Sequence, residues 1–233
     1  MSNFFSFDRD IMIPKIIHYC WFGNKKIPSK TLKLIEKWKK IMPDYKFICW
    51  NENNFDVSTS CVYVKKAYSE KKWAFVSDYV RLYAMYFYGG IYLDTDVEVL
   101  QNFDKYLDEK MFISFESNES LCTAIMGCEQ GNVFIKKFLD TYNYRKFDFS
   151  RVIPNSILIK NFIEEQYCVS LKFNEKRKLN DLTIYERYVF GAKDNRTHKL
   201  EKNKDTIAIH HFDASWYGPI HKILHNIKKY LIK

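Results

Sequence analysis

Residues 73–100 read WAFVSDYVRLYAMYFYGGIYLDTDVEVL and form the most informative part of this 233-residue sequence. No Pro or Gly interrupts residues 73–88, and apolar residues recur there at steps of three and four, which is typical of a buried helix. Gly89 and Gly90 predict the end of that helix, because glycine readily takes the left-handed backbone that closes a helix and reverses the chain. We expect a strand over residues 91–93.

Two carboxylates, Asp94 and Asp96, follow this strand with Thr95 between them. They stand at the end of the strand, so its two-residue period places both carboxylates on one face and Thr95 on the other. Two like charges side by side need a cation, and carboxylate oxygens are hard ligands that suit Mg²⁺ or Mn²⁺. The alternative is a plain exit from the strand into a turn. The apolar run before the pair favours a metal site.

Within the predicted helix, Asp78 and Arg81 occupy positions i and i+3 and therefore share one face. They stand among aromatic and aliphatic residues. Two charged residues in such a helix are not expected to be simply solvated at the surface. The sequence leaves two interpretations open: a local ion pair at an exposed edge, or two groups that contact a ligand.

Composition indicates one globular α/β domain, since the chain suits one substantial core and is short for two. Lys and Arg total 37 against 28 for Asp and Glu, so nucleic acid, anionic lipid and nucleotide phosphates are all candidate partners. Six scattered cysteines without a CxxC pair suggest free thiols in a reducing compartment. No signal peptide and no membrane-spanning run is recognisable, so we expect a cytoplasmic protein.

The rest of the chain predicts a layered α/β architecture. Residues 14–23 and 46–50 read as buried strands, and residues 29–41 read as a helix that Ser29 caps. A strand, a helix and a strand in this order imply a right-handed crossover and parallel pairing. The further elements that we expect are strands over 97–100, 111–115 and 206–211, and helices over 132–142, 154–165 and from about 220 to 232. The predicted fold is a mixed, mostly parallel sheet flanked by helices.

In open α/β sheets, ligands bind beyond the carboxyl ends of the strands, where Asp94 and Asp96 are expected. At this point the sequence resembles the DxD-containing family 32 glycosyltransferases, which include bacterial capsular and fungal mannosyl transferases. It resembles the large clostridial glucosylating toxins more distantly. The resemblance rests on four pieces in the family's order, PKIIHYCWFG (14–23), AFVSDYVRLYAMYFYGGIYLDTDVEVL (74–100), TAIMG (123–127) and TIAIHHFDASW (206–216).

The resemblance implies a GT-A-type fold for residues 1–233 as one catalytic domain. It also implies a nucleotide-sugar donor, a divalent metal, Mn²⁺ or Mg²⁺, and transfer with retention at the anomeric carbon. A glycan or lipid-linked acceptor and a role in surface polysaccharide synthesis would follow, and nucleic acid would not be a partner.

The resemblance also carries roles over to single positions. Tyr92 and Asp94 match positions near the nucleotide, and Thr123 stands where many relatives have an Asn that contacts the donor sugar. Arg81, Asp94 and Asp96 would form the catalytic group, and Asp96, His210 and Asp94 the metal ligands. The donor-binding set is Trp21 (stacking on the base), Asp78, Arg81, Tyr92, Asp94, Thr123, Ser215 and Trp216.

Four residues have competing interpretations. Without the resemblance, Trp21 would be read as a plain core residue, since an aromatic at a strand end often is. Glu116 is the only candidate for the nucleophile of a double displacement, and transfer on the leaving-group side, which needs no nucleophile, is preferred. A histidine inside a strand, such as His18, is more often a hydrogen-bonded core group than a ligand. His211 is expected on the opposite strand face from His210, so the two should not share one metal.

Two rival functions remain at this level. A DxD-type phosphatase or phosphotransferase also places an Asp pair after an apolar strand, but the residues after Asp96 lack the Gly and Thr that it usually has. A non-enzymatic basic module that binds anionic membrane or nucleic acid rests only on the net charge of +9.

The C-terminal segment, about residues 220–232, is predicted to be a basic amphipathic helix. Its apolar residues fall on one stripe, and its lysines lie mainly off that stripe. The helix either packs on the core or makes a peripheral contact with anionic membrane at the inner face. The stripe consists of Ile220, Ile223, Leu224, Ile227, Tyr230 and Leu231.

Overall fold

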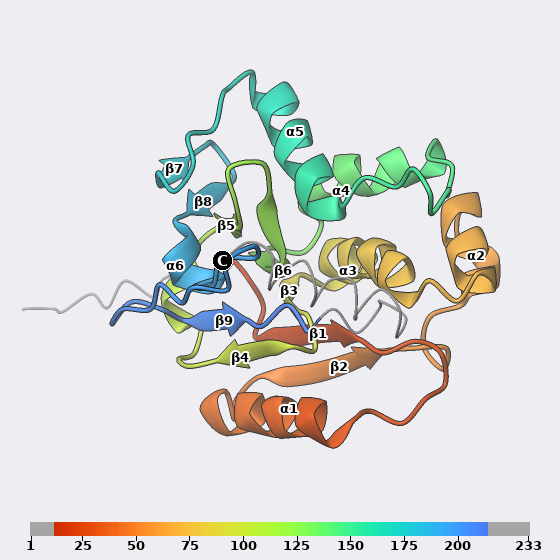
Figure 1. Cartoon of the computed structure of the whole chain (residues 1–233), viewed down its shortest axis with the longest axis horizontal. Coiled ribbons are helices and arrows are strands. Elements are labelled where there is room, and N and C mark those ends of the chain that lie inside the picture. Colours follow the sequence, from red (N-terminus) through yellow and green to blue (C-terminus); the bar gives the residue numbers. More distant parts are fainter. Residues whose placement is uncertain (1–11, 214–233) are drawn as a thin grey trace, which may run out of the picture.

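The protein is built around a seven-stranded sheet with the order β2-β1-β3-β6-β5-β8-β7 (Figure 1). A computed structural model describes residues 12–213. A separate two-stranded ribbon joins β4 to β9. The strands are β1 (Ile16–Cys20), β2 (Lys46–Trp50), β3 (Gly90–Leu93), β4 (Val97–Val99), β5 (Met111–Phe115), β6 (Leu121–Cys128), β7 (Arg177–Lys178), β8 (Thr183–Tyr185) and β9 (Ala208–His210).

The strand directions confirm the mixed, mostly parallel sheet. β1 is parallel to β2 and β3, and β5 is parallel to β8. Only β6 and β7 run against the others, because β6 is antiparallel to β3 and β5, and β7 is antiparallel to β8. The carboxyl ends of β1, β3 and β5 therefore meet at one edge of the sheet.

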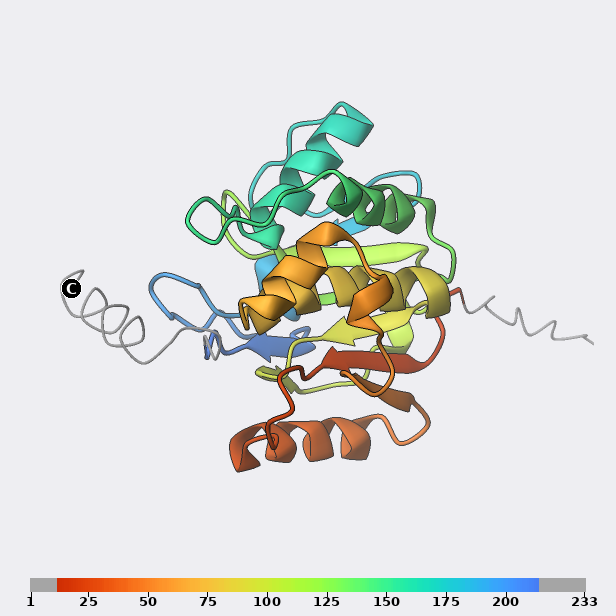
Figure 2. The ribbon, with the colours of Figure 1, turned by 90° about the vertical axis from the view of Figure 1, so that its right-hand side faces the viewer.

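Helices cover both faces of this sheet. Their bounds are α1 (Ser29–Ile41), α2 (Val62–Ser69), α3 (Trp73–Tyr88), α4 (Val133–Asp140), α5 (Asn155–Tyr167) and α6 (Arg187–Phe190). Short 3₁₀ turns occupy Val57–Thr59, Asp104–Tyr106 and Thr141–Asn143. One apolar cluster joins α2, α3, α4 and α5 to the sheet, and a second joins α1, α6 and the β4–β9 ribbon to it. Figure 2 shows α1 well separated from α3 across the strands.

The helix, turn and strand predicted over residues 73–93 are confirmed as α3 and β3. Gly90 has a φ of 102°, and a Cβ there would lie 2.5 Å from the carbonyl oxygen of Ile16. Only glycine fits at this position, because β3 starts directly against β1 and the backbone takes a left-handed conformation.

Other local predictions fail. Ser29 does not cap α1, because Pro28 stands at the N-cap position and no side chain bonds the first turn; Ser29 is the first helical residue. Helix α2 and strands β6, β7 and β8 were not predicted. The predicted final helix, about 220–232, lies outside the described residues. Within residues 12–213 no helix combines the length and apolar character needed to cross a membrane.

His18 is a buried core residue with both ring nitrogens engaged. One nitrogen, Nε2, lies 2.8 Å from the carbonyl oxygen of Gly89, and Nδ1 accepts the indole N–H of Trp50 at 3.1 Å. The ring is therefore neutral with the proton on Nε2. Burial lowers the pKa of His18 to about 4.

This buried histidine predicts a pH-dependent stability. In the unfolded chain His18 takes up a proton near pH 6.5, whereas the folded protein resists it until about pH 4. Because the unfolded state binds more protons in this range, the free energy of unfolding should fall as pH drops through it, by up to about 3 kcal/mol. Urea titrations of wild type and His18→Gln at pH 7.5, 6.0 and 4.5 check this. The wild type should lose more stability than the variant, and parallel losses would contradict it.

Candidate active site

The Asp94-Thr95-Asp96 motif lies in a tight turn between β3 and β4, not on a strand. Asp94 still donates its backbone N–H to Ala124 at 2.9 Å, and the chain then turns so that Val97 N–H reaches the carbonyl of Asp94 at 3.0 Å. The prediction that a strand period sets the two carboxylates on one face is therefore wrong. The turn itself brings both carboxylates to the edge where β1, β3 and β5 end.

Arg81 links α3 to this turn. Its guanidinium lies 2.8 Å from the carboxylate of Asp78 and 3.4 Å from that of Asp94. It also donates to the carbonyl oxygen of Thr123 at 2.5 Å. The ring of Tyr92 lies 4.6 Å below the guanidinium, and its hydroxyl donates to Asp94 at 2.9 Å. The planar, forked guanidinium thus holds groups from three elements in a fixed arrangement.

Burial sets the electrostatics of this group. Arg81 is 4% exposed. Burial, opposed by the charge of Arg81, raises the pKa of Asp78 to about 6. Burial acts to lower the pKa of Arg81, but Asp94, Tyr92 and Asp78 outweigh it and the pKa is raised. The arginine therefore stays charged and can serve an anionic ligand.

His210 reaches the motif from the far end of the chain. The antiparallel β4–β9 ribbon sets Val97 opposite His210. The His210 Nε2 atom lies 3.4 Å from an oxygen of Asp96, and the backbone N–H of Asp213 donates to the other oxygen at 2.8 Å. Burial would raise the pKa of Asp96, but His210 and the Asp213 bond lower it to about 2. Burial acts to lower the pKa of His210, but the charge of Asp96 outweighs burial and the pKa is raised.

Asp94, Asp96 and His210 fit a divalent cation. One ligand atom from each lies within 4.8 Å of the others. Two carboxylates and an imidazole suit Mn²⁺, whereas a pure oxygen set would favour Mg²⁺ or Ca²⁺. The three residues were the predicted metal ligands, and the structure brings them together.

His211 lies apart from this group. Its Nε2 atom is 3.0 Å from the carboxylate of Glu98, which also bonds Lys37 at 2.7 Å. Adjacent histidines of one segment thus engage different carboxylates, in keeping with the alternation expected of a strand.

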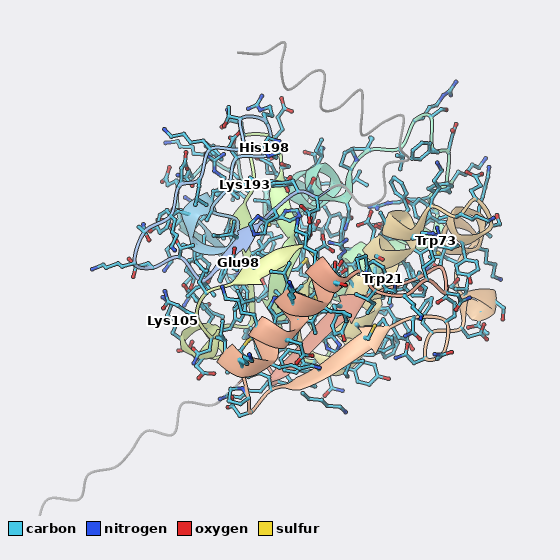
Figure 3. The ribbon with its side chains drawn as sticks, turned by 60° about the horizontal axis from the view of Figure 1, so that its bottom comes forward. Trp21, Trp73, Glu98, Lys105, Lys193 and His198 are labelled. Carbon is cyan, nitrogen blue, oxygen red and sulfur yellow. The ribbon has the colours of Figure 1, made fainter. Side chains whose placement is uncertain are left out.

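Trp21 directly follows β1 at the same edge of the sheet. Its side chain is partly exposed, and its indole N–H donates to the carbonyl of Lys25 at 2.7 Å. Gly23 follows with a φ of 97°, and a Cβ there would lie 2.8 Å from the ring of Trp73. Figure 3 shows Trp21 and Trp73 on the same side of the molecule. The loop therefore carries an accessible aromatic ring beside the first turn of α3.

Thr123 lies on β6 and is buried. Its backbone carbonyl is tied to Arg81, so its position relative to the motif is fixed. Ser215 and Trp216, the remaining predicted donor-binding residues, lie outside the described residues.

Glu116 and Cys122 adjoin the metal-ligand group, and the sequence did not predict this. One ligand atom each of Glu116, Cys122 and His210 lies within 4.8 Å of the others. Burial raises the pKa of both the Glu116 carboxyl and the Cys122 thiol. A signal existed for Glu116, since it ends the apolar strand β5 just as Asp94 ends β3.

The region around the DXD turn is similar to known proteins. Residues 28–113 match the family described as a glycosyltransferase sugar-binding region containing a DXD motif. The chain is 28% identical over 145 residues to inositol phosphoceramide mannosyltransferase 3 of Schizosaccharomyces pombe, covering 61% of this chain and 40% of that protein. It is 33% identical over 113 residues to an uncharacterized glycosyltransferase of Acanthamoeba polyphaga mimivirus, covering 44% of this chain and 43% of that protein.

Among solved structures, the PaToxG glycosyltransferase superposes with a TM-score of 0.56 at 19% identity, over 66% of this chain and 70% of that one. This likeness confirms the predicted GT-A-type fold. The resemblance to the DXD glycosyltransferases is confirmed over the matched region, which contains α1, α3, β3 and the DXD turn. The chain spans less than half the length of the two curated relatives.

Proposed function

We propose that this protein is a metal-dependent, retaining glycosyltransferase that moves a sugar from a nucleotide-sugar donor to a glycan or lipid-linked acceptor. Residues 28–113 match the sugar-binding region of the DXD glycosyltransferases. The observation that carries the proposal is the convergence of Asp94, Asp96 and His210 beside the buried Arg81. Residues 1–233 would form one catalytic domain.

The chemistry of the reaction explains this arrangement. Breaking a bond between a sugar and a diphosphate leaves negative charge on the diphosphate. A bound Mn²⁺ or Mg²⁺ would supply Lewis-acid stabilisation of that charge. Arg81 adds a permanent, buried positive charge, and its fixed position means that little reorganisation is needed during the reaction.

The donor sugar would contact groups that Arg81 organises. Asp78 is held at 2.8 Å from Arg81. Because its pKa of about 6 lies below neutral pH, it is mostly ionised there and can accept hydrogen bonds from sugar hydroxyls. Tyr92 fixes Asp94 through its hydroxyl. Thr123 would offer a hydroxyl at the position where the family resemblance implies an Asn in many relatives.

Retention favours transfer on the leaving-group side. A double displacement needs a carboxylate free to attack the anomeric carbon. Glu116 accepts a hydrogen bond from Ser120 at 2.9 Å through one oxygen, and its other oxygen is turned toward His210, 3.8 Å away. Front-face transfer by the acceptor hydroxyl therefore remains the proposed route.

One experiment tests the proposal against its rivals. Purified protein is incubated with UDP- and GDP-sugars, with and without Mn²⁺ or Mg²⁺, and the released nucleoside diphosphate and inorganic phosphate are measured separately. GDP-mannose comes first, because the fission yeast relative is a mannosyltransferase by name. Metal-dependent release of nucleoside diphosphate is expected. Phosphate release from simple phosphomonoesters would favour the phosphatase, and no turnover with any donor would favour a binding module.

Trp21 provides a second test, because its partly exposed ring would stack on the nucleotide base. Trp21→Ala should weaken the binding of the nucleoside diphosphate by about fivefold, since stacking contributes about 1 kcal/mol beyond area burial. Isothermal titration calorimetry measures this, and thermal unfolding confirms the fold. Tyr144→Ala, which removes an aromatic ring that is 89% exposed, is the control. Equal affinities in both variants would remove Trp21 from the donor site.

The cellular setting remains a proposal as well. A role in capsular or other surface polysaccharide synthesis, in the cytoplasm, fits a lipid-linked acceptor. Peripheral contact with anionic membrane rests on residues 220–232, which lie outside the described part. Co-sedimentation with anionic and neutral vesicles tests this contact, and equal binding to both would contradict it.

A further inference from the structure

His210 presents its two ring nitrogens to two different carboxylates. Nε2 lies 3.4 Å from Asp96, and Nδ1 lies 3.8 Å from Oε1 of Glu116. The side chains of His210 and Glu116 are both nearly buried, each 11% exposed. Among residues 12–213, the Nδ1 atom is buried and has no hydrogen-bond partner.

This geometry matters because a histidine binds a metal as the neutral imidazole. If Nε2 is the ligand atom, the proton must sit on Nδ1 and needs an acceptor. A buried N–H without an acceptor keeps its full desolvation cost, which would weaken metal binding directly. The acceptor that Nδ1 meets therefore influences how well His210 can serve as a ligand.

We propose that Glu116 is a positioning residue: its carboxylate accepts the Nδ1 proton of His210 and keeps Nε2 directed at Asp96 and the metal. The inference rests on the proposed function. The distance of 3.8 Å exceeds the usual limit of about 3.2 Å by roughly 0.6 Å, so a small rotation of either side chain forms the bond.

The surroundings of Glu116 support this role. Ser120 donates to Oε2 at 2.9 Å and so orients the carboxylate with Oε1 toward His210. Ser120 also bonds Ser117 at 2.8 Å, which anchors the turn between β5 and β6. Glu116 is thus held by Ser120 of its own hairpin and by Ser156 of α5, and it does not depend on a ligand for its orientation.

Cys122 is the competing partner for Nδ1. Its ligand atom lies in the same group, within 4.8 Å of those of Glu116 and His210. A thiol is a weak hydrogen-bond acceptor, whereas a carboxylate is a strong one, so the proton is better placed on the Glu116 side. The charged groups around His210 are then Asp96 and Asp94 on one side and Glu116 on the other.

The chain contains a matched control for this pair. Glu98 contacts His211 at 3.0 Å, so a second carboxylate and histidine meet on the same β4–β9 ribbon. Glu98 lies on β4, as Figure 3 shows. It belongs to no metal-ligand group within residues 12–213. Removing it deletes the same kind of contact without touching His210.

The test measures Mn²⁺ binding by electron paramagnetic resonance in the full chain. Glu116→Ala should bind Mn²⁺ roughly 10- to 100-fold more weakly than wild type, the usual loss for an outer partner of a metal ligand. Glu116→Gln should lose less, because its amide oxygen accepts the same proton. Glu98→Ala should bind as wild type does. Circular dichroism and thermal unfolding establish that each variant is folded. If Glu116→Ala does not fold, the comparison of Glu116→Gln with wild type still provides a test.

Each other outcome overturns the inference. Mn²⁺ affinity unchanged in both Glu116 variants would show that Glu116 does not act through His210. A larger loss in Cys122→Ala than in Glu116→Ala would assign the Nδ1 proton to the thiol. Unchanged Mn²⁺ affinity with a loss of transfer of about 1000-fold or more in Glu116→Gln would indicate a nucleophile. If the wild type binds no Mn²⁺, the metal-dependent function fails along with the inference, whereas the first outcome leaves that function standing.

Discussion

Asp96→Asn should reduce kcat by about 1000-fold, equivalent to about 4 kcal/mol of lost transition-state stabilisation. The amide is almost the same size as the carboxylate and can still accept the N–H of Asp213, which lies 2.8 Å away. The substitution therefore removes a charge and a metal ligand while preserving the turn. Since metal binding supplies several kcal/mol to leaving-group stabilisation, the effect should appear in kcat as well as in the Mn²⁺ requirement.

Initial rates across a Mn²⁺ series, with donor saturating, measure this effect. EDTA should abolish wild-type activity, and added Mn²⁺ should restore it. Asp44→Asn is the control, because it removes one negative charge from a side chain that is 57% exposed and that pairs with Lys15, away from the metal-ligand group. Full activity of the wild type in excess EDTA, or of Asp96→Asn without extra Mn²⁺, would refute the metal role.

Arg81→Lys should lower kcat/KM by about 100-fold or more although the charge is retained. The guanidinium reaches Asp78, Asp94 and the carbonyl of Thr123 at once. An ammonium group is a compact point charge and cannot hold all of these in the same plane. One or more of the buried partners is then left unsatisfied, which should also reduce stability by about 1–3 kcal/mol.

The control for this loss is Arg187→Lys. Arg187 is similarly buried, at 5% exposed, and pairs with Asp194 at 2.5 Å and Glu201 at 2.8 Å. It approaches the site through a weak 3.5 Å contact with the backbone carbonyl of Glu116, which a lysine substitution loses without changing any side chain of the metal-ligand group. Both variants should show a lowered unfolding temperature, but only Arg81→Lys should lose activity beyond what its folded fraction explains. Near-native kcat/KM in Arg81→Lys would exclude the proposed contact with the diphosphate.

The comparison of sequence and structure shows where local patterns suffice. Helix α3 was predictable because a long periodic run ends at two glycines, and the same holds for β3. Strand β6 was missed because LCTAIMGC is buried on both faces, so it shows no alternation and resembles a buried helix segment. Helix α2 was missed because eight residues with two lysines carry a weak period.

In the site too, some contacts were predictable from local sequence and others were not. The shared face of Asp78 and Arg81 follows from helix geometry alone, and their contact is seen at 2.8 Å. The turn at Asp94 to Asp96 was misread as strand, because the two-residue period cannot show where β3 stops pairing. The position of Glu116 after an apolar strand was a signal, but its approach to His210 was not predictable, because β5 and β9 belong to different sheets.

The β4–β9 ribbon also has a consequence for biosynthesis. Val97 and His210 are opposite each other in that ribbon although more than a hundred residues of chain separate them. A ribosome will have made α3, the DXD turn and most of the sheet long before β9 emerges. Until then β4 has an unpaired edge and Asp96 lacks His210. If the proposed function holds, the nascent chain should bind neither metal nor donor until β9 docks on β4, so activity should appear only after that late step of folding.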